Sequence, residues 1–77
     1  MTKVYLTFGQ VHTHSVNGKT FDKDCIAVIK CIDYNEGRKL AFEYFDGIFH
    51  NCYSAEEWKD QGDEIIQYFP RGLMEVN

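Results

Sequence analysis

Apolar and polar positions alternate with a period of two near the start of the chain. Every second residue from Lys3 to Phe8 is apolar, namely Val4, Leu6 and Phe8. This period is typical of a strand with one buried face. A second run, Cys25 to Ile32, is apolar and rich in β-branched residues, which predicts another strand.

Asn17-Gly18 lies between these two runs and predicts a tight hairpin turn, because both central residues of a type I′ turn need a positive φ. Val16 then lies opposite Lys19. The same register, extended inward, gives three apolar pairs, which are Phe8 with Ala27, Leu6 with Ile29 and Val4 with Cys31. A one-residue bulge at Gly9 would shift this register by one.

The period changes to that of a helix between Asn35 and Asp46. Apolar or small residues recur there at i, i+3, i+4, i+7 and i+8, which places on one stripe Gly37, Leu40, Ala41, Tyr44 and Phe45. Such a stripe predicts an amphipathic helix packed on one face of a sheet. The N-cap candidates lie in Asp33-Tyr34-Asn35, and Gly47 suits the left-handed position that ends a helix.

The last third of the chain predicts shorter elements. These are a strand over Ile48–Tyr53, a short helix from Ser54 to Asp60 closed by Gly62, a strand over Ile65–Phe69, and an edge strand or packed tail over Leu73–Val76. Ser54 and Glu57 have the spacing of a capping box. The sequence therefore predicts one α+β domain over residues 1–77: a mostly antiparallel sheet, one main helix on one face and a second short helix.

Composition narrows the classes of function. The 77 residues carry 12 acids against 8 Lys and Arg, a net charge of −4. This balance disfavours direct binding to nucleic acid, which requires a basic patch, and favours a protein partner with a basic surface. The 3 cysteines lack CxxC spacing and no apolar run is long enough to span a membrane, so we expect a cytoplasmic protein with reduced thiols and no membrane association.

Two groups of residues are candidates for partner binding. Phe42 lies off the apolar stripe of the helix, beside Arg38 and Lys39, so it is available to a protein partner or to a second copy of the chain unless the C-terminal tail covers it. The other group is an acidic run that contains Glu56, Glu57, Asp60, Asp63 and Glu64. This run is either a solvated helix face or a row of carboxylates that imitates nucleic-acid phosphates in a basic groove.

A metal site is an alternative. His12 and His14 are two residues apart, as are His50 and Cys52, so each pair shares one face of a predicted strand. If the strands were neighbours, the four side chains would form the tetrahedral His/Cys set that zinc prefers, in a zinc-binding domain or a small metal-dependent enzyme. Otherwise the histidines are exposed polar residues and Cys52 belongs to the core. The sequence contains no nucleophile–base arrangement, so we expect a non-enzymatic protein without a cofactor.

Three segments resemble short reading frames of tailed bacteriophages and prophages: Thr7–Cys25, Ala41–Phe49 and Tyr68–Gly72. The order of a hairpin, one helix and further strands is also similar to that of small anti-CRISPR proteins. The resemblance assigns no individual residue. It implies a phage-encoded protein that works in the cytoplasm of the bacterial host, where it binds and blocks a defence or nucleic-acid-processing complex. A nucleic-acid-binding module is the third alternative.

Overall fold

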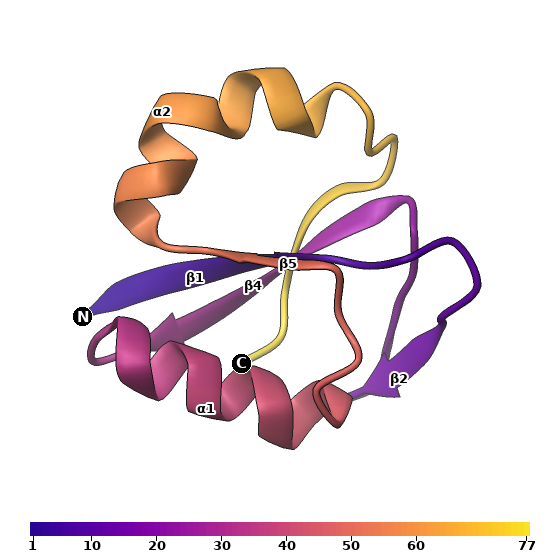
Figure 1. Cartoon of the computed structure of the whole chain (residues 1–77). Coiled ribbons are helices and arrows are strands. Elements are labelled where there is room, and N and C mark those ends of the chain that lie inside the picture. Colours follow the sequence, from indigo (N-terminus) through magenta and orange to yellow (C-terminus); the bar gives the residue numbers. More distant parts are fainter.

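The computed structural model describes all 77 residues as three layers, with a central sheet between two helices (Figure 1). The sheet has the strand order β5-β1-β4-β6, and β2 and β3 form a separate two-stranded arm. Helix α1 lies on one face of the sheet and α2 on the other. The elements are β1 (Thr2–Thr7), β2 (His14–Val16), β3 (Lys19–Phe21), β4 (Cys25–Cys31), α1 (Tyr34–Phe45), β5 (Asn51–Tyr53), α2 (Ala55–Ile66) and β6 (Gly72–Glu75). The predicted α+β class is confirmed.

The predicted hairpin turn is confirmed at the tip of the arm. Asn17 has φ 51° and Gly18 has φ 76°, the two positive values that a type I′ turn requires. Val16 lies opposite Lys19, as the sequence predicts. The turn chemistry of two residues therefore sets this part of the fold.

The inner part of the hairpin pairs two residues away from the predicted register. Leu6 lies opposite Ala27, where the prediction placed Phe8. The segment that leads from β1 to the Asn17-Gly18 turn is longer than the segment that leads from this turn to β4. A turn in which the Gly9 C=O accepts a hydrogen bond from the His12 N–H at 3.4 Å accommodates the extra residues. The predicted pairs were wrong in all three cases: Phe8 with Ala27, Leu6 with Ile29 and Val4 with Cys31. Because the shift is even, the predicted residues still face the core.

The main core lies between α1 and the sheet. From β1 it takes Val4 and Leu6, and from β4 the alternate residues that begin with Cys25 and end with Cys31, all of them buried. Helix α1 contributes the predicted stripe, of which Gly37, Ala41 and Phe45 are buried and Leu40 and Tyr44 partly buried. The Asp33 carboxylate caps the helix by accepting a hydrogen bond from the Glu36 N–H at 2.8 Å, so the helix begins at Tyr34, one residue before the predicted start.

Helix α2 corrects two predictions. It runs on to Ile66, so the strand predicted at Ile65–Phe69 was wrong, and Gly62 does not end the helix. Gly62 is buried under Trp58, since a Cβ there would lie 2.7 Å from the indole Nε1. Trp58 in turn stacks on Tyr5 of β1, with ring centroids 4.5 Å apart and planes 7° apart. The apolar residues of this segment therefore follow a helical stripe that packs on the sheet.

The two edge strands differ from each other in how closely they follow the prediction. The strand predicted over Ile48–Tyr53 is shorter, because only β5 pairs with β1 and the residues before it form a loop. The predicted edge strand over Leu73–Val76 is confirmed as β6, parallel to β4. The Asn77 side chain extends this pairing through two hydrogen bonds to the Lys30 backbone, at 2.8 and 2.9 Å. Neither helix is long and apolar enough to cross a membrane.

Candidate functional site

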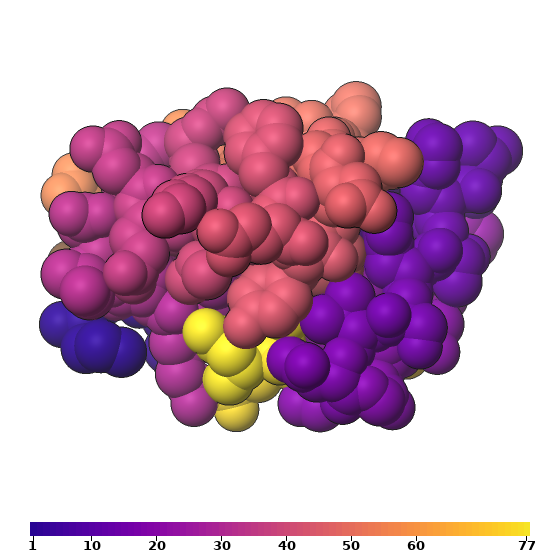
Figure 2. Space-filling model, turned by 90° about the horizontal axis from the view of Figure 1, so that it is seen from below, coloured from indigo at the N-terminus to yellow at the C-terminus, as the bar shows by residue number.

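The outer face of α1 carries the first group of predicted binding residues. It is the exposed stripe opposite the core: Asn35, Arg38, Lys39, Phe42, Glu43 and Asp46. Figure 2 views the molecule from this side, with α1 spread over its left and centre and the β2–β3 arm at its right. The structure therefore brings Arg38, Lys39 and Phe42 together on one open surface.

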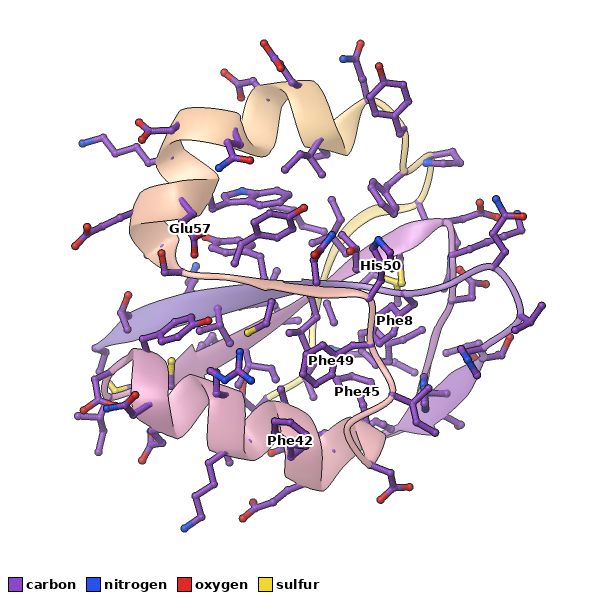
Figure 3. The ribbon with its side chains drawn as sticks, viewed as in Figure 1. Phe8, Phe42, Phe45, Phe49, His50 and Glu57 are labelled. Carbon is purple, nitrogen blue, oxygen red and sulfur yellow. The ribbon has the colours of Figure 1, made fainter.

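Phe42 is half exposed, at 50 %, but its ring is held in place. It makes an edge-to-face contact with Phe49, with centroids 5.5 Å apart, in the loop before β5 (Figure 3). The ring also lies over Gly47, where an added Cβ would approach it to 2.8 Å. Phe49 and Gly47 were not predicted to have this role. A half-exposed aromatic ring whose rotamer is already fixed loses little entropy when a partner binds.

Arg38 completes this aromatic surface without an acidic partner in its own chain. Its guanidinium carbon lies 5.8 Å from the centroid of the Phe42 ring, and its Nη1 donates to the Tyr34 hydroxyl at 3.5 Å. No carboxylate pairs with it, because the ion pairs of the chain join other residues: Lys23 with Asp24, Lys30 with Glu75 and Arg71 with Asp22. The charge of Arg38 is therefore free to pair with another molecule.

The outer face of α2 carries the second predicted group. The helix holds five carboxylates and one lysine, Lys59, a net charge of −4 that equals the net charge of the whole chain. All five carboxylate residues are exposed and none forms an ion pair. Glu57 also completes the predicted capping box, in which its carboxylate accepts from the Ser54 N–H at 3.0 Å and the Ser54 hydroxyl accepts from the Glu57 N–H at 3.1 Å.

The two groups lie on opposite sides of the sheet. Figure 3 shows Phe42 on α1 below the sheet and Glu57 on α2 above it. Arg38 and Lys39 accompany Phe42, whereas Glu56 and Asp60 accompany Glu57. A flat partner surface therefore contacts one group or the other, and the six predicted binding residues form two separate faces.

The predicted metal set is not assembled, since no group of three or more His, Cys, Asp or Glu side chains is placed to hold a metal ion. The His14 ring packs between Phe8 and Phe45, at 5.4 and 5.2 Å, and its Nε2 lies 3.0 Å from the Ile48 carbonyl oxygen. Cys52 packs against the core, and burial raises the pKa of its thiol. His50 precedes β5 instead of sharing a strand face with Cys52. The four side chains that the zinc alternative requires therefore do not converge in this structure.

Two shallow hollows complete the surface. One, of about 230 Å³, is lined by His12, Phe49 and His50 together with Gly9 and Ile48, and it lies beside the aromatic surface of α1. The other, of about 290 Å³, lies where the first turns of both helices meet β1. The caps Asp33 and Ser54 already accept hydrogen bonds from backbone N–H groups in those first turns. No sequence pattern indicates either hollow, because each is lined by residues far apart in the chain.

Comparison of the chain with protein-family models, with curated proteins and with solved structures finds no match. The chemistry of the two helix faces is therefore the basis for a functional proposal. One face is aromatic with charges of both signs, and the other is uniformly acidic apart from Lys59.

Proposed function

We propose that this chain is a non-enzymatic inhibitor that binds a basic surface of a bacterial protein complex and blocks it. The observation that carries the proposal is the outer face of α2, where five unpaired carboxylates concentrate the net charge of the chain on one side. The natural occupant of a basic protein groove is nucleic acid, so the class of target is a complex that processes nucleic acid, defence complexes included.

The spacing of the α2 carboxylates supports this proposal. Glu56, Asp60 and Asp63 follow one line along the helix at i, i+4 and i+7, so their Cβ atoms lie about 5–6 Å apart. A regular row of negative charges competes with phosphates for the Lys and Arg side chains of a groove. Because the row faces solvent without internal partners, it also attracts a basic surface over about one Debye length, roughly 8–10 Å, and so raises the association rate.

The resemblance to phage reading frames and small anti-CRISPR proteins supports the biological setting of the proposal. Such proteins act by stoichiometric contact in the host cytoplasm, and the two helix faces offer contact surfaces of that kind. The working hypothesis is thus an anti-CRISPR-like host-defence inhibitor. Direct nucleic-acid binding is the competing class, and a gel-shift assay at physiological salt distinguishes the two.

The proposal is tested by affinity purification of the chain from a bacterial lysate, with identification of the proteins that co-elute. The key variant is Glu56→Gln/Glu57→Gln/Asp60→Asn, in which the glutamine that replaces Glu57 keeps the capping box. We expect about tenfold weaker binding of the recovered partner at low salt, and a shallower dependence of binding on salt.

Glu43→Gln is the matched control, because it removes a carboxylate from the opposite side of the molecule. It should leave this binding unchanged. Equal binding by the triple variant and the wild type at every salt concentration would contradict phosphate imitation by α2. A shift of nucleic acid alone, without any protein partner, would favour the nucleic-acid-binding module instead.

A further inference from the structure

The outer face of α1 has a charge pattern that is complementary to itself. Its first half carries Arg38 and Lys39, its second half carries Glu43, and its C-cap residue is Asp46, with Phe42 between the two charged groups. None of these four charged residues forms an ion pair within the chain. The pattern places both a positive and a negative half on one open helix, on either side of an aromatic residue.

We propose that this face binds the same face of a second copy of the chain, with the two α1 helices antiparallel about a twofold axis near Phe42. An antiparallel arrangement places the positive half of each helix against the negative half of the other. Arg38 then faces Asp46 of the second copy and Lys39 faces its Glu43. The two Phe42 rings meet at the axis, and each ion pair is formed twice, once on either side of the axis.

The pattern fits a second copy better than it fits an unrelated protein. A twofold interface uses the same patch on both subunits, so the patch must complement itself. A uniformly basic or acidic partner would meet like charges on one half of α1, which is unfavourable. Phe42 and Arg38 also belong to the aromatic and arginine residue types that are enriched at protein interfaces.

The size of the surface indicates a reversible dimer. Helix α1 has 12 residues and is therefore about 18 Å long. Its apolar contribution is limited to the half-exposed Phe42 and its neighbours in the loop, Phe49 and Ile48, of which Ile48 is 41 % exposed. An interface of this size is at the low end for specific complexes, so we expect a dissociation constant of about 10–100 µM.

The proposed dimer goes beyond the proposed function and does not depend on it. The α2 faces lie on the far side of each sheet, so a dimer formed through α1 leaves both carboxylate rows exposed. Loss of the dimer therefore leaves the row on α2 intact, and loss of partner binding through α2 leaves the dimer intact. An experiment can therefore contradict either proposal without contradicting the other.

Sedimentation velocity of the full chain tests the dimer over a range of about 5–500 µM. We expect a monomer–dimer equilibrium that weakens as salt is raised, because the ion pairs are exposed. Phe42→Ala should weaken dimerisation about tenfold or more. Gln61→Ala, at an exposed position of α2 on the far side of the sheet, is the control and should leave dimerisation nearly unchanged. A wild-type chain that remains monomeric throughout would overturn the proposal.

A charge exchange gives the sharper test. Lys39→Glu and Glu43→Lys each place like charges opposite one another in a homodimer, so each variant alone should dimerise about tenfold more weakly than the wild type. An equimolar mixture of the two variants should recover association. In the mixed pair both contacts between positions 39 and 43 join an acidic residue to a lysine, one in the wild-type order and one in the reverse order. Circular dichroism first checks that both variants are folded, as expected for exposed positions. A mixture no stronger than its separate components would overturn the antiparallel pairing.

Discussion

A single residue, Gly37, determines how closely α1 approaches the sheet. A Cβ at this position would lie 2.9 Å from the Cys31 Sγ and closer still to the side chain of Val4. Both neighbours are buried. The glycine therefore has a packing role, although glycine lowers the intrinsic stability of a helix interior by about 1 kcal/mol relative to alanine.

Gly37→Ala is expected to lower the free energy of unfolding by about 1–2 kcal/mol. Overpacking a filled core costs about 1–3 kcal/mol, and the higher helix propensity of alanine offsets only part of this cost. Urea denaturation followed by circular dichroism measures the difference. Asn35→Ala, on the exposed side of the same helix, is the control and should change stability by less than about 0.5 kcal/mol.

The cause is checked by Gly37→Ala/Val4→Ala, in which removal of the Val4 methyl groups, the atoms nearest to the added Cβ, makes room for the new methyl group. The double variant should be less destabilised than the sum of the two single variants, since the residues are in direct contact. Strict additivity would show that the Gly37→Ala effect has another origin.

The two helices differ in how far they were predictable. In α1 the apolar stripe, the N-cap and the C-terminal glycine all point to one helix, and the structure confirms them. In α2 the apolar residues of the stripe are few, and the run Ile65–Phe69 is rich in β-branched and aromatic residues. The capping box predicted the first part of α2, including Trp58. The part beyond Asp60 was missed because the helix packs on the sheet through contacts such as that of Trp58 with Tyr5, which join residues far apart in sequence.

The hairpin shows the same division between local and long-range control. The positive φ values at Asn17 and Gly18 follow from the chemistry of two adjacent residues, so the turn was predictable. The register between β1 and β4 depends on how many residues connect each of these two strands to the Asn17-Gly18 turn. No local signal supplies that number, and the predicted register was wrong by two residues.

Trp58→Ala tests how α2 is attached to the sheet. Trp58 stacks on Tyr5 and covers Gly62, so its removal leaves the helix without its main aromatic contact. We expect a loss of about 2 kcal/mol, less than for a fully buried tryptophan because Trp58 is only partly buried. Amide hydrogen exchange should show the largest loss of protection in α2.

The control for this prediction is Lys59→Ala, which removes an exposed neighbour on the same helix. It should leave stability and exchange nearly unchanged. Equal loss of protection in α1 and α2 of the Trp58→Ala chain would mean that α2 does not open separately from the rest of the molecule.

At the scale of the whole molecule, the β2–β3 arm and the C-terminal strand hold each other in place. Asn17 donates to the Val76 C=O at 2.8 Å, and Lys19 donates to the Glu75 C=O at 2.7 Å. Arg71 donates to the Thr20 C=O at 2.9 Å. These contacts join residues more than 50 positions apart, so no local pattern predicts them.

The candidate faces were predictable only in part, for the same reason. Exposure of a charged or aromatic residue on a helix follows from its position relative to the apolar stripe, so the exposure of both candidate groups was predicted from the sequence. The metal set required four side chains from separate segments to converge. Chain topology instead turned His14 and Cys52 toward the core and left His12 and His50 beside a hollow.

The ion pair between Arg71 and Asp22 gives the last prediction. The two side chains are 3.1 Å apart, and the Asp22 carboxylate also accepts a hydrogen bond from the Asp24 N–H at 3.0 Å. The Asp24 hydrogen bond and the Arg71 charge lower the pKa of Asp22 below its ordinary value of 3.8. The carboxylate is therefore favoured in the folded state, and its contribution to stability is complete above the unfolded pKa and disappears as the pH falls through the folded pKa.

Asp22→Asn should consequently lower the free energy of unfolding at pH 7, by about 1 kcal/mol for a partly exposed pair. The difference from the wild type should shrink as the pH falls below about 4, because the wild-type carboxyl group then becomes neutral as well. Urea denaturation at several pH values measures both chains. Asp63→Asn, which removes an unpaired carboxylate on α2, should show no such pH-dependent difference. A constant difference between wild type and Asp22→Asn at every pH would mean that the Asn side chain disturbs the turn itself, and that the charge of Asp22 does not hold the arm to the C-terminal strand.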